Sequence, residues 1–447
     1  MSAWRDLVTA SLIGTERAVV PPVQIPGWPS GADPATGSTR SDPADLLLGR
    51  AAGLTAARRA GRVPDRAEPL PVADPDPRLA VSPAARRRLA AMLGGEHPDL
   101  LSEWLTTAVT RGLRPPAQLV PALLDRARRA SRADPGLRRL AAQAGGPRAR
   151  WLAGLNPDWA FAAAEPTGAP GQDAWRLGDA SQRRGYLTAR RAADPGSARE
   201  LLTASWAAAG AAERVMFLSV LAADPASLSP ADEPLLETAL DDRADDVRSW
   251  AAYLLATLPG SALGQRMADR ALSCLRIERG VRGTHLITSP PAECDASMRR
   301  DGIAPGPGAG RSQLADRTRL MLELVARTPL RTWTHAFAMP PATIVTVRSG
   351  DWAPVLFTGW SRAAVAQRDQ DWMTALITEA LTGRPPASPA ENGALSQLAR
   401  RADPALGAPE VLAGPEPGVP LAVRDTIKVL RFRYEMRKEL DVDDNGG

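Results

Sequence analysis

The chain has 447 residues, of which 44% are hydrophobic and 4% aromatic, so it can fold as two or three ordinary domains or as one extended repeat array. Its two cysteines, Cys274 and Cys294, exclude a disulfide framework, and no apolar run approaches the roughly 20 residues of a membrane span, so we expect a cytoplasmic protein. The pI near 9.8 does not by itself indicate nucleic-acid binding, because the net charge is only +5 and Lys428 and Lys438 are the only lysines among 55 basic residues.

The first 85 residues are expected to form short helices joined by linkers. An amphipathic helix is predicted over 2–13, ending at Gly14, and a second helix over about 43–59. The stretches on either side of the second helix are rich in Pro, Gly and Asp, which predicts loops. The first helix is expected to place four apolar side chains on one side: Trp4, Leu7, Val8 and Leu12.

Residues 86–279 are predicted to contain stacked helix pairs. Helical patterns recur at short intervals with Pro or Gly at the breaks, and each is too short to be stable alone. The clearest unit begins at Leu235. The acidic stretch 241–246 within it fits capping of the helix that follows, by Asp245 or Asp246, better than a cation site. The expected buried face of that helix consists of Val247, Trp250, Ala251, Leu254, Leu255 and Leu258.

The same segment resembles a HEAT repeat. The residues that carry the likeness are Asp242, Val247, Arg248, Ala251, Ala252 and Leu255, and a weaker copy runs through 134–142. In HEAT proteins the Asp and Arg of successive repeats bond along the inner turns, so the resemblance implies that Asp242, Asp245 and Arg248 form a structural repeat turn. We expect an all-α chain that forms an α-α superhelix, a solenoid of the HEAT or armadillo type with long Pro/Gly-rich loops.

The rest of the chain is expected to contain a flexible loop at 280–312 and a helical region at 313–447. The run TIVTV at 343–347 is the one candidate strand. The last helix, at about 421–440, is expected to be a terminal cap with one charged face. The side chains expected to point inward are Leu314, Met321, Leu324 and Val325 in the first helix of this region and Val423, Ile427, Leu430 and Tyr434 in the last.

The motifs that carry chemistry are incomplete. The segment GPGAGRS at 306–312 has Pro305 and Arg311 where a phosphate-binding loop needs Gly and Lys, and no strand is predicted before it, so a loop is favoured over a nucleotide site. The candidate zinc ligands Cys274, His285 and Cys294 lie too far apart in sequence for a local zinc motif. Since no nucleophile motif is present either, we expect no catalytic residue, no cofactor and no metal.

One charge feature favours a binding surface. Residues 101–150 contain 10 Arg and 3 acidic residues, whereas residues 201–250 contain 3 Arg and 9 acidic residues. An Arg-rich ridge within 111–150 would attract an acidic partner, and a solvated helix face is an equally good interpretation. The candidate partner-binding residues are Arg126, Arg128, Arg129, Arg132, Arg138 and Arg139.

Four segments resemble the landmarks of an uncharacterised bacterial family, a domain of unknown function. They are WRDLVTASLIGTER at 4–17, RWLAGLNPDW at 150–159, PLRTW at 329–333 and LFTGW at 356–360, so the resemblance spans nearly the whole chain. Members of that family sit beside MoxR-type AAA+ ATPases, von Willebrand A-type proteins and SWIM zinc-finger proteins. The resemblance implies a protein partner, with an AAA+ ATPase or a von Willebrand A-type protein as candidates, and supplies no catalytic residue.

We therefore expect a non-catalytic scaffold or adaptor that binds a protein through a helical-repeat surface. One alternative is a nucleic-acid-binding repeat protein that uses the Arg-rich ridge. A second alternative is an enzyme whose site is assembled from scattered Asp, Glu and Arg side chains, which a pocket with converging carboxylates or arginines would favour.

Overall fold

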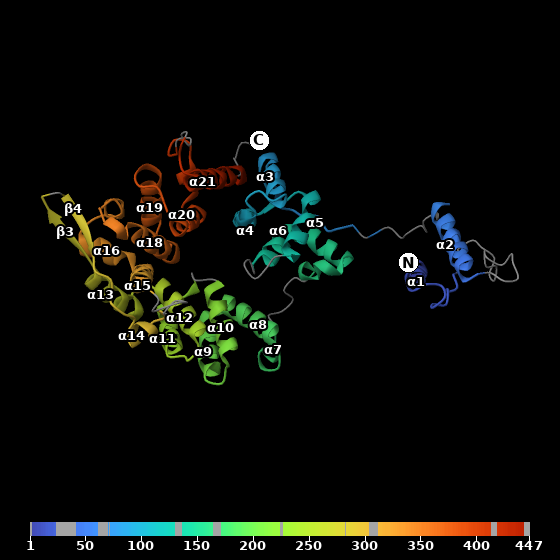
Figure 1. Ribbon diagram of the computed structural model, residues 1–447, viewed down its shortest axis with the longest axis horizontal. Coiled ribbons are helices and arrows are strands. Elements are labelled where there is room, and N and C mark those ends of the chain that lie inside the picture. The colour runs from blue at the N-terminus through green and yellow to red at the C-terminus, as the bar shows by residue number, and fades with distance from the viewer. Residues whose placement is uncertain are drawn as a thin grey trace. The chain divides into compact units, whose positions relative to one another are not determined.

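The computed structural model describes residues 2–23, 42–60, 70, 72–129, 136–163, 171–223, 227–281, 283–303, 312–412 and 418–441. The chain divides into two compact units, 1–72 and 73–447, and each is considered by itself. Both consist almost wholly of helices (Figure 1), so the all-α class predicted from the sequence is confirmed. Among the described residues, no helix is both long enough and apolar enough to cross a membrane.

The first unit contains two packed helices, α1 (Ser2–Ile13) and α2 (Pro43–Arg59), with the predicted bounds. The predicted apolar face of α1 is wrong in part: Leu7 is buried, but Val8 is 43% exposed and Leu12 is 83% exposed. Within the first unit α1 packs on α2, and two short helices shield only a narrow strip of each other. Arg50 fastens the segment after α1 to α2, because its buried guanidinium donates to the Val20 carbonyl at 2.7 Å.

The first half of the second unit contains eleven helices among its described residues. They are α3 (Pro83–Leu93), α4 (Leu101–Thr110), α5 (Val120–Arg128), α6 (Leu137–Leu155), α7 (Gln172–Arg176), α8 (Ala180–Ala193), α9 (Pro195–Trp206), α10 (Ala211–Ala223), α11 (Glu233–Leu240), α12 (Asp245–Thr257) and α13 (Ala262–Cys274). Two very short parallel strands, β1 (Leu79–Ala80) and β2 (Leu113–Arg114), pair beside them. Short 3-10 turns link several helices: η1 (Pro98–Leu100), η2 (Ala117–Leu119), η3 (Pro157–Ala162) and η5 (Pro230–Asp232).

The second half of this unit begins with an antiparallel hairpin, β3 (Leu275–Gly280) and β4 (Gly283–Thr288). Its helices are α14 (Ala296–Arg300), α15 (Gln313–Arg327), α16 (Leu330–Phe337), α17 (Pro341–Ile344), α18 (Ala353–Gln367), α19 (Gln370–Thr382), α20 (Pro389–Arg401) and α21 (Leu421–Leu440). Two further 3-10 turns are η6 (Gly350–Trp352) and η7 (Pro404–Gly407). The last helix has the predicted bounds.

Packing follows the order of the chain over much of this unit. Contacts join α10 to α12, α12 to α13, α13 to α15, α15 to α18, α18 to α20 and α20 to α21. The predicted face of α12 is buried at Val247, Ala251, Leu254 and Leu255, which supply apolar area to this shared core. Trp250 is only partly buried. Short helices thus gain their stability from neighbours, as the sequence pattern indicated.

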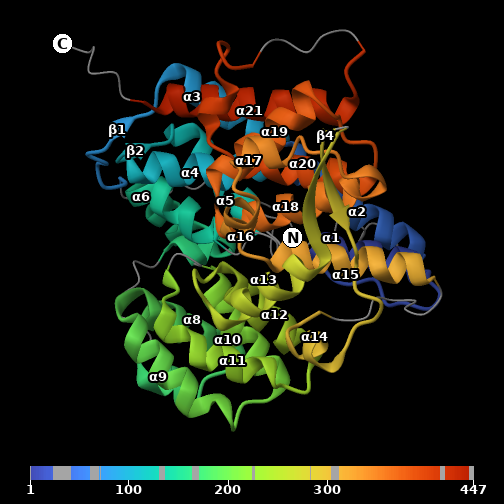
Figure 2. The ribbon, with the colours of Figure 1, turned by 90° about the vertical axis from the view of Figure 1, so that its left-hand side faces the viewer.

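The last helix does not end the array as an exposed cap. Helix α21 packs against α3 and α4 as well as α20, and the two ribbon views agree that α21 lies beside α3 (Figure 2). Arg433 in the middle of α21 is only 4% exposed, and Phe432 and Met436 are buried next to it. The two ends of the second unit are therefore in contact, since its last helix covers its first ones.

Two local predictions are wrong. The run 343–347 is not a strand: Pro340 and Pro341 start the short helix α17, and Ile344 is buried on it. The predicted loop at 280–312 contains all of β4 and all of α14 within its described residues. The α14 turn forms because the Asp295 side chain accepts from the Met298 N–H at 2.8 Å and Met298 is buried.

A third correction concerns helix α15. Leu314, expected to face inward, is 69% exposed, because it lies in the first turn, ahead of the residues that pack on α13 and α18. The other three side chains of that predicted stripe are buried: Met321, Leu324 and Val325. The glycine-rich segment 306–312 lies outside the described residues except for Ser312, which caps α15 by accepting from the Ala315 N–H at 3.3 Å.

Candidate functional site

The Arg-rich ridge lies on α5 and at the start of α6, and much of it has partners within the fold. Arg128 and Arg129 form ion pairs with Asp125 at 3.9 and 3.7 Å. Arg138 donates to the Arg128 carbonyl at 3.0 Å and to the Ala127 carbonyl at 3.4 Å, so it satisfies backbone groups at the end of α5.

The remaining ridge residues do not form one cluster in the structure. Arg126 and Arg139 are exposed, on different helices, and Arg132 lies outside the described residues. Arg138 also stacks on Phe161, with its guanidinium carbon 5.7 Å from the ring centre. The geometry therefore assigns Arg138 a packing role, while all five described arginines of the ridge remain exposed.

The residues of the HEAT-like turn do lie together. The Asp242 carboxylate accepts from Arg214 on α10 at 2.5 Å and from the Ala244 N–H at 2.9 Å. Burial alone would raise the pKa of Asp242, but these donors hold it below its usual value. Arg248 donates to the Asp242 carbonyl at 2.7 Å and forms an ion pair with Asp245.

The predicted capping of α12 by Asp245 or Asp246 is wrong. The N-cap residue is Ala244, and it makes no side-chain cap. Asp245 and Asp246 occupy the first turn instead, where their charges face the positive end of the helix. Asp242 contributes to the cap instead, because its carboxylate accepts a hydrogen bond from the N–H of the N-cap residue Ala244.

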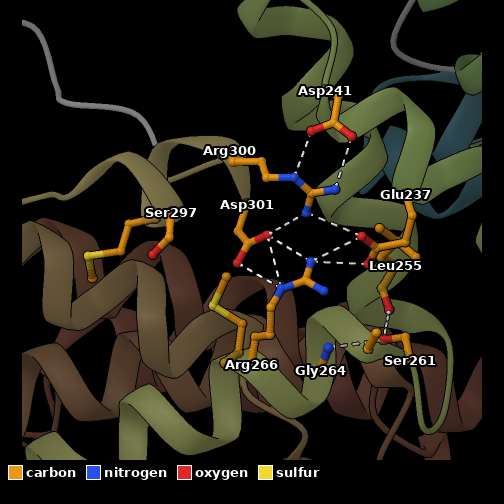
Figure 3. Close-up of polar contacts among 12 residues, drawn as sticks. Glu237, Asp241, Leu255, Ser261, Gly264, Arg266, Ser297, Arg300 and Asp301 are labelled. Carbon is orange, nitrogen blue, oxygen red and sulfur yellow. Dashed lines mark hydrogen bonds and ion pairs between the residues drawn. The ribbon is translucent and has the colours of Figure 1, made fainter.

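A second cluster of charged side chains joins α11, α13 and α14 (Figure 3). Asp301 is 1% exposed and accepts from Arg266 at 2.7 Å, from Arg270 at 2.6 Å and from Arg300 at 3.4 Å. Glu237 accepts from Arg266 at 3.0 Å and from Arg300 at 3.3 Å. Figure 3 shows Arg266 and Arg300 each bonded to both Asp301 and Glu237. Arg300 also donates to Asp241 at 2.7 Å.

This cluster has the residue types of an enzyme site but the geometry of a structural one. Its three arginines face three carboxylates, and none of its members lines any of four recesses found among the described residues, beside His285, Tyr253, His97 and Ala222. The hydrogen bond from Arg300 holds the pKa of Asp241 below its usual value, so this carboxylate is a poor proton donor at neutral pH. We assign the cluster the task of fastening α14 to α11 and α13.

The three candidate zinc ligands are not brought together. Cys274 ends α13, His285 lies on β4, and the Cys294 thiol faces the Ile303 carbonyl at 3.3 Å. Burial raises the pKa of both cysteine thiols, which disfavours the thiolate that zinc requires. Within the described ranges, no group of three or more His, Cys, Asp or Glu side chains is placed to hold a metal ion.

The strongest candidate for a binding site is a set of three adjoining pockets on the second unit. The central pocket, of about 580 Å³, lies among α12, α15, α18 and α20 (Figure 1). It shares Tyr253, Val365 and Ala366 with a pocket of about 390 Å³ at the C-terminal ends of α18 and α20. It shares Gly393 with a pocket of about 540 Å³ between α20 and α21. We call these three pockets together the trough.

The central pocket is lined mainly by small apolar groups. Thr358 and Ser361 on α18 donate their hydroxyls to the Pro354 and Phe357 carbonyls of their own helix, at 2.8 and 2.7 Å. Their polar atoms are therefore satisfied. The apolar lining consists of Ala256, Ala326, Val365, Ala366, Pro389, Ala390, Gly393 and Ala394. Small side chains leave the depth that an inserted side chain needs.

The helices that form the trough are held firmly. Ser388 caps α20, while the fully buried Glu391 carboxylate accepts from the Ser388 N–H at 3.1 Å and from Arg384 at 2.5 Å. Burial alone would raise the pKa of Glu391, but these donors lower it. On the other side, α18 approaches α15 so closely that a Cβ at Gly359 would lie 2.7 Å from the Val325 side chain.

Comparison with known proteins gives the family but not its activity. The model of a family of unknown function, DUF5691, matches residues 6–405. The chain belongs to this family. No curated protein and no solved structure matches it.

The trough of this DUF5691 member was not anticipated from its sequence. One signal was present: α18 reads APVLFTGWSRAAVAQ and α20 reads PAENGALSQLARR, and both place small residues at helical spacing. Such stripes usually mark close helix packing, and on α18 the stripe that includes Gly359 does pack on α15. Only the structure shows that the neighbouring small residues of this DUF5691 chain line a pocket.

Proposed function

We propose that this DUF5691 protein is a non-catalytic scaffold that holds a segment of another protein in the trough. The observation that carries the proposal is the trough itself, a recess formed by helices distant in the chain and lined by small apolar groups. A recess of this kind suits side chains that a partner inserts between rigid helices. The contact of α21 with α3 and α4 supports the proposal, because it helps keep the walls in place without a partner.

Gly393 lines two of the three pockets of the trough. It lies in the interior of α20, is exposed, and an added Cβ would meet nothing within 4 Å. Glycine inside a helix costs about 1 kcal/mol relative to alanine, and here the fold has no steric need for it. Gly185 on α8 is also exposed and unhindered, so this property is not confined to the trough.

The alternatives have weaker support from the geometry. The nucleic-acid alternative uses the basic ridge, whose Arg128, Arg129 and Arg138 are exposed but also contact groups of the chain itself. For the enzyme alternative, the cluster around Asp301 is internally paired, and the ionisable side chains His285, Arg348, Glu379 and Arg384 line a separate pocket of about 480 Å³. As partners we propose an AAA+ ATPase or a von Willebrand A-type protein, on the strength of the family resemblance.

Site-specific photocrosslinking in the native host tests the proposal. A photoreactive amino acid replaces Gln397, which is exposed and lines the trough. The control replaces Gln172, which is exposed on α7 and lines none of the three pockets. We expect one protein to crosslink from position 397 and not from 172. Equal crosslinking from both positions, or none from 397, contradicts the proposal.

A further inference from the structure

The basic side chains of the trough fall into two groups. Those of the first group have a carboxylate partner: Arg327 and Arg362 pair with Glu323, Arg400 with Asp99, and Lys428 with Asp425. The second group is Arg368 and Arg401, which both line the pocket at the C-terminal ends of α18 and α20. Across the described part of the chain, neither has a carboxylate within ion-pair distance, so these two are the arginines of the trough that have no ion-pair partner.

The two guanidinium groups of the second group are borne by segments that are held side by side. Gln370 at the start of α19 donates to the Arg401 carbonyl at 3.4 Å and accepts from the Asp403 N–H at 2.8 Å. These two bonds connect the turn that contains Arg368 to the end of α20 that contains Arg401. Both arginines are exposed, so a partner can reach them.

The backbone at Arg368 adds a second observation. Arg368 ends α18 in the left-handed region, with φ 55° and ψ 33°. Helices commonly end in this conformation, but the residue there is usually glycine, since a Cβ is unfavourable in it. Arginine at a helix C-terminus also interacts favourably with the helix dipole, yet it could do so from the preceding turn without this backbone conformation. Ala338 ends α16 in the same conformation, so the positive φ places Arg368 beside the pocket without by itself assigning its side chain a use.

The adjoining central pocket has the opposite character. Its hydroxyls are satisfied within α18, its charged side chains are paired, and most of its remaining lining is alanine, valine, proline and glycine. It offers an incoming polar group few free partners, and a buried polar group without a partner is costly. This section consequently selects aliphatic side chains.

We infer that the partner segment is amphipathic along its length, with small aliphatic side chains in the central pocket and one or two carboxylates that pair with Arg368 and Arg401. This inference rests on the proposed function, because it names the chemistry of the segment that the trough holds. Guanidinium and carboxylate form strong, paired hydrogen bonds. The acidic end fixes the direction in which the segment lies, and the aliphatic part supplies most of the contact area.

Selection of peptides from a random 12-residue display library against the full chain tests this inference. We expect the selected peptides to combine aliphatic residues with Asp or Glu near one end, and to crosslink to a photoreactive residue at position 397. The Arg368→Glu/Arg401→Glu variant should bind them at least tenfold more weakly. The control Arg86→Glu/Arg87→Glu, which changes the same charge at exposed positions on α3, should bind them as the unaltered chain does.

The outcomes separate the inference from the proposed function. Peptides that crosslink at position 397 but contain no acidic residues, and bind the 368/401 variant unchanged, overturn the inference and leave the proposed function standing. Selected peptides that do not crosslink at 397, or a library that yields no binder, count against both. Tight binding of a single-stranded 20-mer oligonucleotide that is lost in the 368/401 variant also overturns the inference, because those arginines would then serve phosphate.

Discussion

Arg433 and Glu103 form a two-point ion pair across 330 residues of chain. Arginine Nε lies 2.8 Å from one carboxylate oxygen and Nη2 lies 2.9 Å from the other. The remaining guanidinium nitrogen donates to the Ala399 and Ala402 carbonyls at 2.8 and 2.6 Å. One side chain of α21 thus fastens α4 to the end of α20, which forms a wall of the trough.

Loss of this side chain should be strongly destabilising. Arg433→Ala leaves the Glu103 carboxylate and two carbonyls without their donor, and we expect the free energy of unfolding to fall by about 3 kcal/mol or more. Urea denaturation measures it. Lys428→Ala on the same helix is the matched control, since Lys428 is 67% exposed, and it should change stability by less than about 0.5 kcal/mol. Equal effects would show that α21 is not fastened through Arg433.

Two glycines should respond in opposite ways to alanine. At Gly359 a Cβ would meet Val325 at 2.7 Å and the Leu322 carbonyl at 3.4 Å, so Gly359→Ala should destabilise the protein by about 1 to 3 kcal/mol. At Gly393 the space is open, so Gly393→Ala should stabilise α20 by up to about 1 kcal/mol. Thermal unfolding of both variants checks the pair. A stabilising Gly359→Ala would contradict the close packing of α15 and α18.

The buried pair of Asp232 and Arg191 should make stability depend on pH. Two bonds of 2.9 Å join them. Burial alone would raise the pKa of Asp232, but Arg191 and the Ser229 N–H hold it below its usual value. The contribution is therefore complete above the unfolded pKa of about 4 and is lost as the pH falls through the lower folded value.

Comparison of Asp232→Asn with the unaltered chain measures that contribution. At pH 7 we expect the variant to be less stable by about 3 kcal/mol, and the difference should shrink as the pH falls below about 4. The exposed Asp246→Asn is the control. A difference that grows on acidification would have the wrong sign for a carboxylate with a lowered pKa.

Asp301 should hold α14 in place. Asp301→Asn removes the charge that faces Arg266, Arg270 and Arg300, so three guanidinium groups would repel one another around a neutral amide. We expect amide hydrogen exchange in 295–303 to become faster, while exchange in the distant α8 stays the same. Unchanged protection of 295–303 would mean that Met298 and Ile303, both buried, are sufficient to hold the segment.

Local sequence patterns predicted the helices well, but they could not predict which distant segments of the chain contact one another. The bounds of α1, α2 and α21 follow from caps, breakers and periodicity. The hairpin β3–β4 was missed because its inward-facing residues Leu275, Ile277 and Leu286 form an apolar pattern that does not distinguish a strand from a helix. The register of the two strands also depends on contacts with segments distant in the chain. The opposite error was made at 343–347, where a strand was predicted from the β-branched residues. The two prolines before this run start a helix instead.

The same limit explains what could be said of the site. The Arg-rich ridge was visible as composition, but the sequence could not show that Arg138 binds the α5 carbonyls. The trough depends on Tyr253, Val365 and Gly393, which come from three helices and have no shared motif. The bond of Arg433 to Glu103 joins residues 330 positions apart, and no local pattern specifies such a pair.

The affinity of the crosslinked partner for two glycine variants tests the central claim most directly. Gly393→Phe fills the trough from a position where the fold has room, and Gly185→Phe makes the same change on α8, at an exposed helical glycine that also has open space around it. By calorimetry we expect at least tenfold weaker binding to the first variant and unchanged binding to the second. Equal affinity for both variants would contradict the account, because the partner would then bind outside the trough.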